Sequence, residues 1–147
     1  MAANDGGNGA PANAGNGSVI TYHCLCTHLV MATNITLANM PKRQVDAAAT
    51  STTGSLATTL TMQGLSTDDK AMILKLEDGF EKRYPVRCSR CGLMAGYQLD
   101  KSQFAGTEEK TGPNAEVLYV LPGGLMTTEE MRGGKDMERE IGVVASI

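Results

Sequence analysis

The chain has 147 residues, which is the length of one ordinary domain. Aromatic residues make up 4% of it, none is Trp, and 17 residues are Gly, so we expect a small core that needs a further crosslink. The net charge of −3, from 13 basic and 16 acidic residues, excludes a uniformly basic nucleic-acid binder, and no apolar run is long enough to span a bilayer.

The two ends of the chain differ from its middle in composition. Residues 1–17 contain only Ala, Asn, Gly, Asp and Pro after the first Met, and we expect a disordered leader without the basic and apolar regions of a secretory signal. The predicted domain covers residues 18–122, with a flexible insertion at residues 50–69. A charged tail is expected at residues 123–147.

The first predicted elements form a β-hairpin. Ser18–Cys24 and Leu29–Leu37 are rich in β-branched and apolar residues, which is typical of strands, and residues 26–28 would make the turn. Pro41 ends this pattern because proline cannot continue a central strand. One or two helical turns are predicted at Gln44–Ala49.

A second group of strands follows a Ser/Thr-rich stretch, Thr50–Gln63, that is expected to be a loop. Strands are predicted at Ala71–Glu77 and Phe80–Val86 on either side of the turn dipeptide Asp78-Gly79, with Pro85 interrupting the second. The remaining predicted elements are strands at Leu93–Leu99 and Val117–Leu121 and a frayed surface helix at Thr127–Glu140. This pattern predicts a mainly β domain with short helical turns and disordered termini.

All four cysteines lie in two tight pairs. Cys24 and Cys26 form a Cys-x-Cys pair, and Cys88 and Cys91 form a Cys-x-x-Cys pair followed by Gly92. Two such turns can supply the four ligands of a tetrahedral zinc site. The sequence therefore predicts a structural Zn²⁺ that staples a small β domain, with no open position for a catalytic water.

Other interpretations of these residues stay open. The thiols could be unmetallated or form two disulfides, although a reducing compartment argues against disulfides, and a redox pair would need a βαβ context that is absent. His23 or His28 could replace one cysteine as a ligand, but a hydrogen-bonding neighbour is the favoured role. No acid/base set or phosphate-binding loop is visible, so we expect a protein that is not an enzyme and has no small-molecule substrate.

Basic residues surround the second cysteine pair. They are candidates for partner or RNA contact, and charge balance for the thiolates is the favoured alternative because the whole chain is acidic. The four candidates are Lys82, Arg83, Arg87 and Arg90.

Three motifs follow one another along the chain. They are Tyr-His-Cys-Leu-Cys at residues 22–26, Met-Pro-Lys-Arg and Val-Asp-Ala-Ala within residues 37–48, and Glu-Lys-Arg-Tyr-Pro-Val-Arg-Cys-Ser-Arg-Cys-Gly-Leu at residues 81–93. In this order they resemble the motifs of the STING ER exit protein family. The resemblance spans about residues 19–121 and supports the shared cysteine framework. It also marks matched positions of unknown role at Pro41, Arg43, Asp46, Tyr84 and Gly92.

The chain also departs from this family pattern. Thr27 stands where the family usually has Gly after the first cysteine pair. The basic stretch before Val45 is shorter, and the segment at residues 50–69 is longer and richer in Ser and Thr.

The resemblance implies a non-enzymatic adaptor that promotes exit of membrane cargo from the endoplasmic reticulum. Its partners would be the lipid-kinase and COPII vesicle machinery, at the cytoplasmic surface of the endoplasmic reticulum, with peripheral membrane contact. Family members are also associated with late spliceosomes, so a nuclear role in pre-mRNA splicing, as a small zinc module that docks into a large assembly, is the alternative.

Overall fold

The computed structural model describes residues 19–52 and 58–133 of the chain. These residues form two antiparallel β-sheets, and the predicted mainly β fold with short helical turns is confirmed. The predicted leader and the segments at residues 53–57 and 134–147 lie outside the described residues. No helix of the described ranges is long and apolar enough to cross a membrane.

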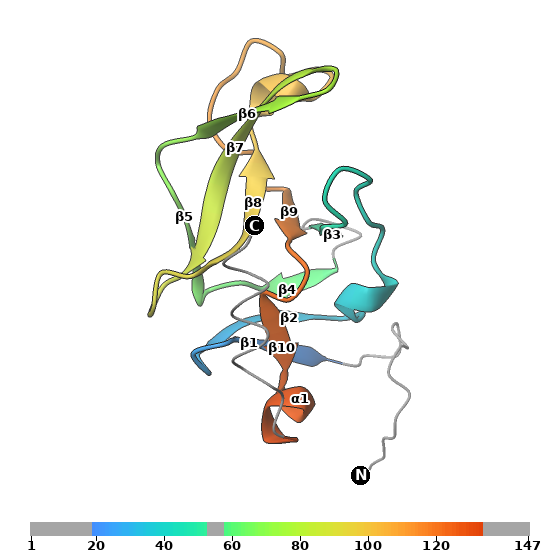
Figure 1. The fold of residues 1–147 in the computed structure, drawn as a ribbon, viewed down its shortest axis with the longest axis vertical. Coiled ribbons are helices and arrows are strands. Elements are labelled where there is room, and N and C mark those ends of the chain that lie inside the picture. The colour runs from blue at the N-terminus through green and yellow to red at the C-terminus, as the bar shows by residue number, and fades with distance from the viewer. Residues whose placement is uncertain (1–18, 53–57, 134–147) are drawn as a thin grey trace.

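The first sheet has the strand order β10-β1-β2-β4 (Figure 1). Its strands are β1 (Ile20–Cys24), β2 (Leu29–Thr33), β4 (Thr59–Thr61) and β10 (Leu125–Thr127). A 3-10 turn, η2 (Leu37–Asn39), follows β2, and a short helix, α1 (Thr128–Arg132), follows β10. The predicted hairpin is thus present, with its second strand ending earlier than expected.

The second sheet has the order β3-β9-β8-β7-β5, and β6 also pairs with β7. Its strands are β3 (Ala49–Thr52), β5 (Leu65–Thr67), β6 (Met72–Leu76), β7 (Gly79–Cys88), β8 (Met94–Leu99) and β9 (Val117–Val120). The 3-10 turn η3 (Lys101–Gln103) lies between β8 and β9. The predicted strands around residues 71–77, 93–99 and 117–121 are confirmed.

The main hydrophobic core lies between the two sheets. Tyr22, Val30 and Met31 of the first sheet belong to the same buried cluster as Val86 and Leu118 of the second. A second cluster, on the other face of β9, contains Tyr97, Leu99 and Tyr119. Strand β9 contributes alternate residues to the two clusters, because successive side chains of a strand point to opposite faces.

Two expectations for the early part of the chain were wrong. Strand β2 ends at Thr33 rather than at residue 37, and the Thr33 hydroxyl donates to the Ile35 carbonyl at 2.5 Å, which turns the chain. Residues 44–48 form a tight turn, not helical turns, with Ala47 at a φ of 62°. The Asp46 carboxylate accepts a hydrogen bond from the Ala48 N–H at 3.0 Å and competes with helix formation.

The segment expected as a loop and insertion contains β3, β4 and β5 within its described residues. These strands are short and polar on one face, so pairing with neighbours rather than local sequence forms them.

Proline does not interrupt β7. Pro85 lies between the part of β7 that pairs with β6 and the part that pairs with β5, and its carbonyl accepts from the Asp68 N–H. Proline has no N–H to donate to a neighbouring strand, and Pro85 lies where neither β6 nor β5 pairs with β7, so this edge of the ladder loses no hydrogen bond there.

The segment expected as a charged tail contributes to the fold as well. Leu125 to Thr127 pair with β1 as strand β10, and the Thr127 side chain and Glu130 form a capping box that starts α1. The predicted helix is present as far as Arg132, and residues 134–140 lie outside the described part of the chain.

Candidate metal centre

The first cysteine pair lies where β1 turns into β2, with Cys24 as the last residue of β1 and Cys26 in the turn. The Cys24 N–H donates to the His28 carbonyl at 2.8 Å, and the Thr27 N–H donates to the Cys24 carbonyl at 2.8 Å. These bonds require Thr27 to adopt a φ of 81°, a left-handed conformation that favours glycine. The departure from the family pattern at this position therefore places a strained residue in the turn that holds two thiols.

The second cysteine pair lies where β7 turns into β8, with Cys88 as the last residue of β7 and Cys91 in the turn. The Cys88 N–H donates to the Leu93 carbonyl at 2.9 Å, and the Gly92 N–H donates to the Cys88 carbonyl at 2.9 Å. Gly92 has a φ of 83°, as its place after the Cys-x-x-Cys pair predicts. Backbone geometry thus sets the positions of Cys88 and Cys91 much as it does in the first turn.

Gly64 connects the two cysteine turns through its backbone. Its N–H donates to the Val30 carbonyl at 3.1 Å, and its carbonyl accepts from the Ser89 N–H at 2.9 Å. A Cβ at this position would lie 2.4 Å from the Leu29 carbonyl oxygen, so a larger residue would push β2 away. This role could not be read from the sequence, since the glycine lies in a segment expected as an insertion.

Apolar side chains beside the cysteines pack the two turns together. Leu25, between the first two cysteines, is 1% exposed and clusters with Met126 of β10. Leu93, directly after Gly92, packs against the same cluster. The intervening residue of the Cys-x-Cys pair is therefore part of the core, a role that its apolar character could have indicated.

The four thiols lie close together. Every ligand atom of the group is within 4.8 Å of the others, with Cys24 Sγ to Cys91 Sγ at 3.5 Å and Cys26 Sγ to Cys88 Sγ at 3.8 Å. A zinc ion about 2.3 Å from each of four tetrahedral sulfurs needs sulfur–sulfur separations of about 3.8 Å. All four cysteines are free, so the group could bind one metal ion.

Three of the four thiols have pKa values shifted from the usual value of cysteine, in different directions. Burial raises the pKa of Cys24, which ends β1 at 1% exposure, and it also raises the pKa of Cys91, whose residue is exposed. For Cys26, burial is outweighed by a backbone hydrogen bond from His28 and by the neighbouring thiols, which lower the pKa, so the group shares its protons unevenly. Binding a dication would release those protons and hold the thiolate forms.

The two histidines are neighbours of this group. His23 uses both ring nitrogens elsewhere, with Nδ1 2.9 Å from the Thr27 carbonyl oxygen and Nε2 2.9 Å from the Thr128 hydroxyl. His28 Nε2 lies 3.5 Å from the Ser89 hydroxyl. Both positions agree with the hydrogen-bonding role favoured from the sequence.

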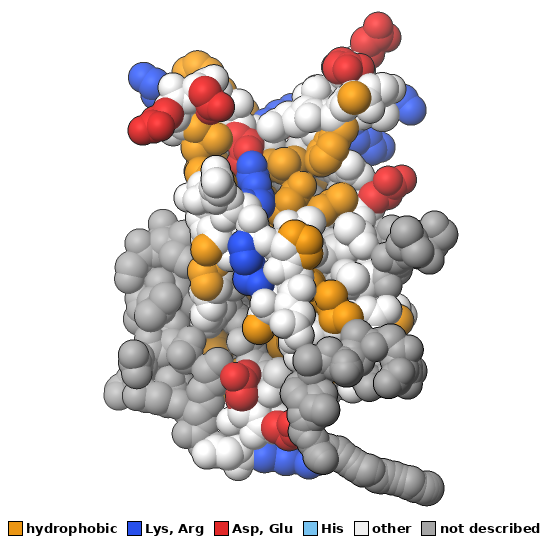
Figure 2. All heavy atoms as spheres, turned by 90° about the vertical axis from the view of Figure 1, so that its right-hand side faces the viewer, with side chains coloured by type: hydrophobic (Ala, Val, Ile, Leu, Met, Phe, Trp, Pro, Cys, Tyr) orange, Lys and Arg blue, Asp and Glu red, His pale blue; other side chains and the backbone are white. Residues whose placement is uncertain are grey.

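The four basic candidates do not share one free surface. Arg83 is 7% exposed and pairs inside the fold, while Arg87 Nε lies 3.0 Å from Asp68 Oδ2. Lys82 Nζ lies 3.6 Å from the buried Asp100 carboxylate, and Arg90 is exposed. On the face drawn in Figure 2, the Lys and Arg side chains of the described residues are scattered among hydrophobic ones. Arg83 is therefore unsuited to RNA contact, and two of the other three are already paired.

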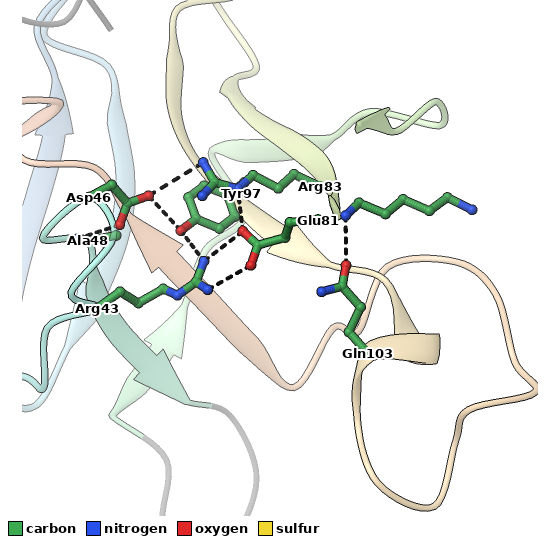
Figure 3. A network of polar contacts seen from close by, with 8 residues as sticks. Arg43, Asp46, Ala48, Glu81, Arg83, Tyr97 and Gln103 are labelled. Atoms are coloured by element: carbon green, nitrogen blue, oxygen red, sulfur yellow. Dashed lines mark hydrogen bonds and ion pairs between the residues drawn. The ribbon is translucent and has the colours of Figure 1, made fainter. Parts of the chain in front are cut away.

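Four charged side chains join the turn at residues 43–48 to the second sheet (Figure 3). This charged quartet consists of Arg43, Asp46, Glu81 and Arg83. Glu81 accepts from Arg43 Nη1 at 2.9 Å, from Arg43 Nη2 at 2.7 Å and from Arg83 Nε at 2.6 Å. Asp46 lies 3.4 Å from Arg83 Nη1. Hydrogen bonds from Arg43 hold the pKa of Glu81 below its usual value.

Two tyrosines complete the surroundings of the quartet. The Tyr97 hydroxyl donates to Asp46 Oδ2 at 2.7 Å, and the rings of Tyr97 and Tyr119 stack with centroids 5.3 Å apart. The Arg83 guanidinium lies 4.1 Å from the Tyr97 ring centroid. The motif positions Arg43 and Asp46, whose role was unknown from the sequence, thus fix the turn that leads into β3.

Tyr84, another matched position of the family motifs, binds a buried carboxylate. The Tyr84 hydroxyl donates to Asp100 Oδ1 at 2.9 Å, and Asp100 also accepts from the Ser102 and Gly112 N–H groups. The motif residues of the chain therefore include the thiol group and a separate set of polar contacts to the second sheet, made by Arg43, Asp46 and Tyr84.

The comparison with known families agrees with this arrangement. The chain matches the STEEP1 domain over residues 13–135, which includes both cysteine pairs and all described strands. This match covers most of the chain, including β10 and α1 beyond the stretch that the sequence motifs span. The protein belongs to the STEEP1 domain family.

Proposed function

We propose that the protein is a non-enzymatic adaptor that promotes exit of membrane cargo from the endoplasmic reticulum. The observation that carries the proposal is the family match over residues 13–135, which fits the adaptor role expected from the motifs. The finer role is recruitment of a lipid-kinase complex and support of COPII vesicle formation, at the cytoplasmic surface of the endoplasmic reticulum. Membrane contact would then be peripheral or through partners.

The metal in this proposal is Zn²⁺ with a structural role. Its ligands would be the sulfur atoms of Cys24, Cys26, Cys88 and Cys91, whose spacing fits a zinc tetrahedron. Four protein thiolates fill the coordination sphere, which leaves no place for a bound water or substrate. The metal would fix the β1–β2 turn to the β7–β8 turn and so support the surfaces that partners contact.

The splicing alternative has less support from the described residues. It relied on a basic stretch for RNA contact, and Arg83 of that stretch is buried in the charged quartet while Arg87 pairs with Asp68. A spliceosome role would need contacts by other surfaces, and the adaptor role is therefore the one we propose.

Affinity purification of the tagged full chain from its own cells, combined with an export assay, tests the proposal. We expect COPII coat or lipid-kinase subunits among the captured proteins and slower exit of membrane cargo when the chain is depleted. Wild type and the exposed-site control Lys110→Asp should restore export, and Cys88→Ser should not. Capture of late spliceosome proteins together with unchanged cargo export would overturn the adaptor role in favour of splicing.

A further inference from the structure

Strand β6 has a free edge. It pairs with β7 from Met72 opposite Arg83 to Leu76 opposite Gly79, and no other strand of the described residues pairs with it. Alternate residues of an antiparallel strand direct their N–H and C=O groups away from the paired neighbour. β6 therefore presents a row of backbone donors and acceptors along the hairpin drawn at the top of Figure 1.

Exposed apolar side chains adjoin this edge. Ile73 is 61% exposed and Met72 39% exposed, and Phe80, opposite Lys75 on β7, is 72% exposed. Sheet proteins commonly protect such an edge with charges, proline or a bulge, whereas β6 carries one charge among apolar residues. The hairpin therefore combines an open edge with exposed apolar side chains on both faces, Ile73 and Phe80 on one and Met72 on the other.

The sequence of β6 is complementary to itself in one antiparallel register. When two copies pair about Leu74, Met72 lies opposite the partner's Leu76, and Leu74 lies opposite the partner's Leu74. Ile73 lies opposite the partner's Lys75, so the two copies of Lys75 are not directly opposed. Apolar residues thus meet across the strands on one face, and the lysine stem covers apolar surface on the other.

Charges at the ends of β6 are complementary in the same register. Lys70 lies two residues before β6 and Asp78 two residues after it, and both are exposed. Pairing about Leu74 brings Lys70 to the same end as the partner's Asp78, and the two-fold symmetry repeats this at the other end. No cation would then face a cation across the new strand pair.

We propose that β6 pairs antiparallel with β6 of a second copy, which joins the second sheets of two chains into one continuous sheet. The contact is isologous, since the same strand serves on both sides, and it closes after two copies. It is separate from the thiol group and does not depend on the adaptor role.

Sedimentation equilibrium of the full chain tests this dimer, because the monomer–dimer constant can be measured at concentrations from micromolar to about 1 mM. We expect a concentration-dependent dimer in the wild type. Lys70→Asp places two acidic side chains opposite each other at each end of the strand pair, and Asp78→Lys places two basic ones there. Each substitution should therefore weaken dimerisation roughly tenfold. The double variant, with the charges exchanged, should restore wild-type dimerisation.

Lys110→Asp is the matched control, since it makes the same charge change at an exposed loop residue that belongs neither to β6 nor to the turns at its two ends. It should leave dimerisation unchanged. A wild-type chain that stays monomeric over the whole range would overturn the proposal. So would a double variant that dimerises no better than the single variants.

Discussion

Removing the charge of Glu81 tests whether the charged quartet holds the fold together. Glu81 is 5% exposed and accepts three hydrogen bonds from Arg43 and Arg83. The substitution Glu81→Gln keeps the volume of the side chain and removes one of two negative charges of the quartet. It also places an amide N–H₂ against the Arg43 guanidinium in either orientation of the amide. The quartet then carries a net positive charge within the fold.

The expected loss follows from the burial of the quartet. Breaking a buried ion pair by removing one partner costs about 3–5 kcal/mol, because the other charge is left uncompensated. The Arg43 side chain is 21% exposed and can regain part of its hydration. We therefore expect Glu81→Gln to lower the free energy of unfolding by about 3 kcal/mol.

Urea denaturation at a fixed zinc concentration measures this loss from the shift of the unfolding midpoint. Glu77→Gln is the matched control, since Glu77 is exposed in the turn of the same hairpin, and it should change the free energy of unfolding by less than about 0.5 kcal/mol. If Glu81→Gln also stayed within about 0.5 kcal/mol of the wild type, the quartet would not be a structural anchor.

Three further substitutions test other parts of the account. Gly64→Ala places a Cβ 2.4 Å from the Leu29 carbonyl oxygen. Differential scanning calorimetry should therefore show a free energy of unfolding about 2 kcal/mol lower, and a chelator should remove metal more readily. An unchanged stability and an unchanged rate of metal loss would refute the role of this contact. Thr27→Gly relieves the left-handed conformation at a φ of 81° and should stabilise the chain by about 1 kcal/mol in urea denaturation, and a loss would contradict that strain. For Asp100, burial alone would raise the pKa, but hydrogen bonds from Ser102 and Gly112 outweigh burial and lower it. The stability that its charge contributes is therefore full above pH about 4 and is lost as pH falls through the lowered folded-state pKa. Asp100→Asn should lower the free energy of unfolding by about 2 kcal/mol at pH 7, and this difference from wild type should shrink below pH about 4. A difference that grows on acidification would contradict a stabilising role for the Asp100 charge.

The sequence predicted the strands whose apolar residues alternate or run together. β1, β6, β8 and β9 fall where that pattern places them, and the cysteine turns follow from the spacing of the thiols. Gly92 was expected to adopt a positive φ, and it does. These features depend on local sequence, so a single chain is enough to predict them.

The missed features depend on partners distant in sequence. Strand β10 has three residues and exists because it pairs with β1, about 100 positions earlier. The turn at residues 43–48 resembles a helical stretch in sequence, but Arg43 binds Glu81 and Asp46 binds Tyr97, and these contacts hold it in another conformation. Gly64 lies in a polar stretch, and its importance becomes visible only where β2 passes beside it.

The site residues show the same division. The order of the four cysteines was sufficient to predict one group, and the thiols do lie within 4.8 Å of one another. The basic residues around the second pair looked like a surface from the sequence alone. The strand that carries Arg83 turns this side chain toward Glu81, which a charge count cannot reveal.

Native mass spectrometry of the full chain, purified without chelator, tests the central claim most directly. We expect the measured mass to exceed the mass of the polypeptide by that of one zinc ion, minus the mass of the protons that the thiols release on binding it. The four cysteines should also not react with an alkylating reagent until the zinc is removed. A folded chain that carries no metal and alkylates at all four cysteines at once would contradict the claim that one metal ion joins the two turns.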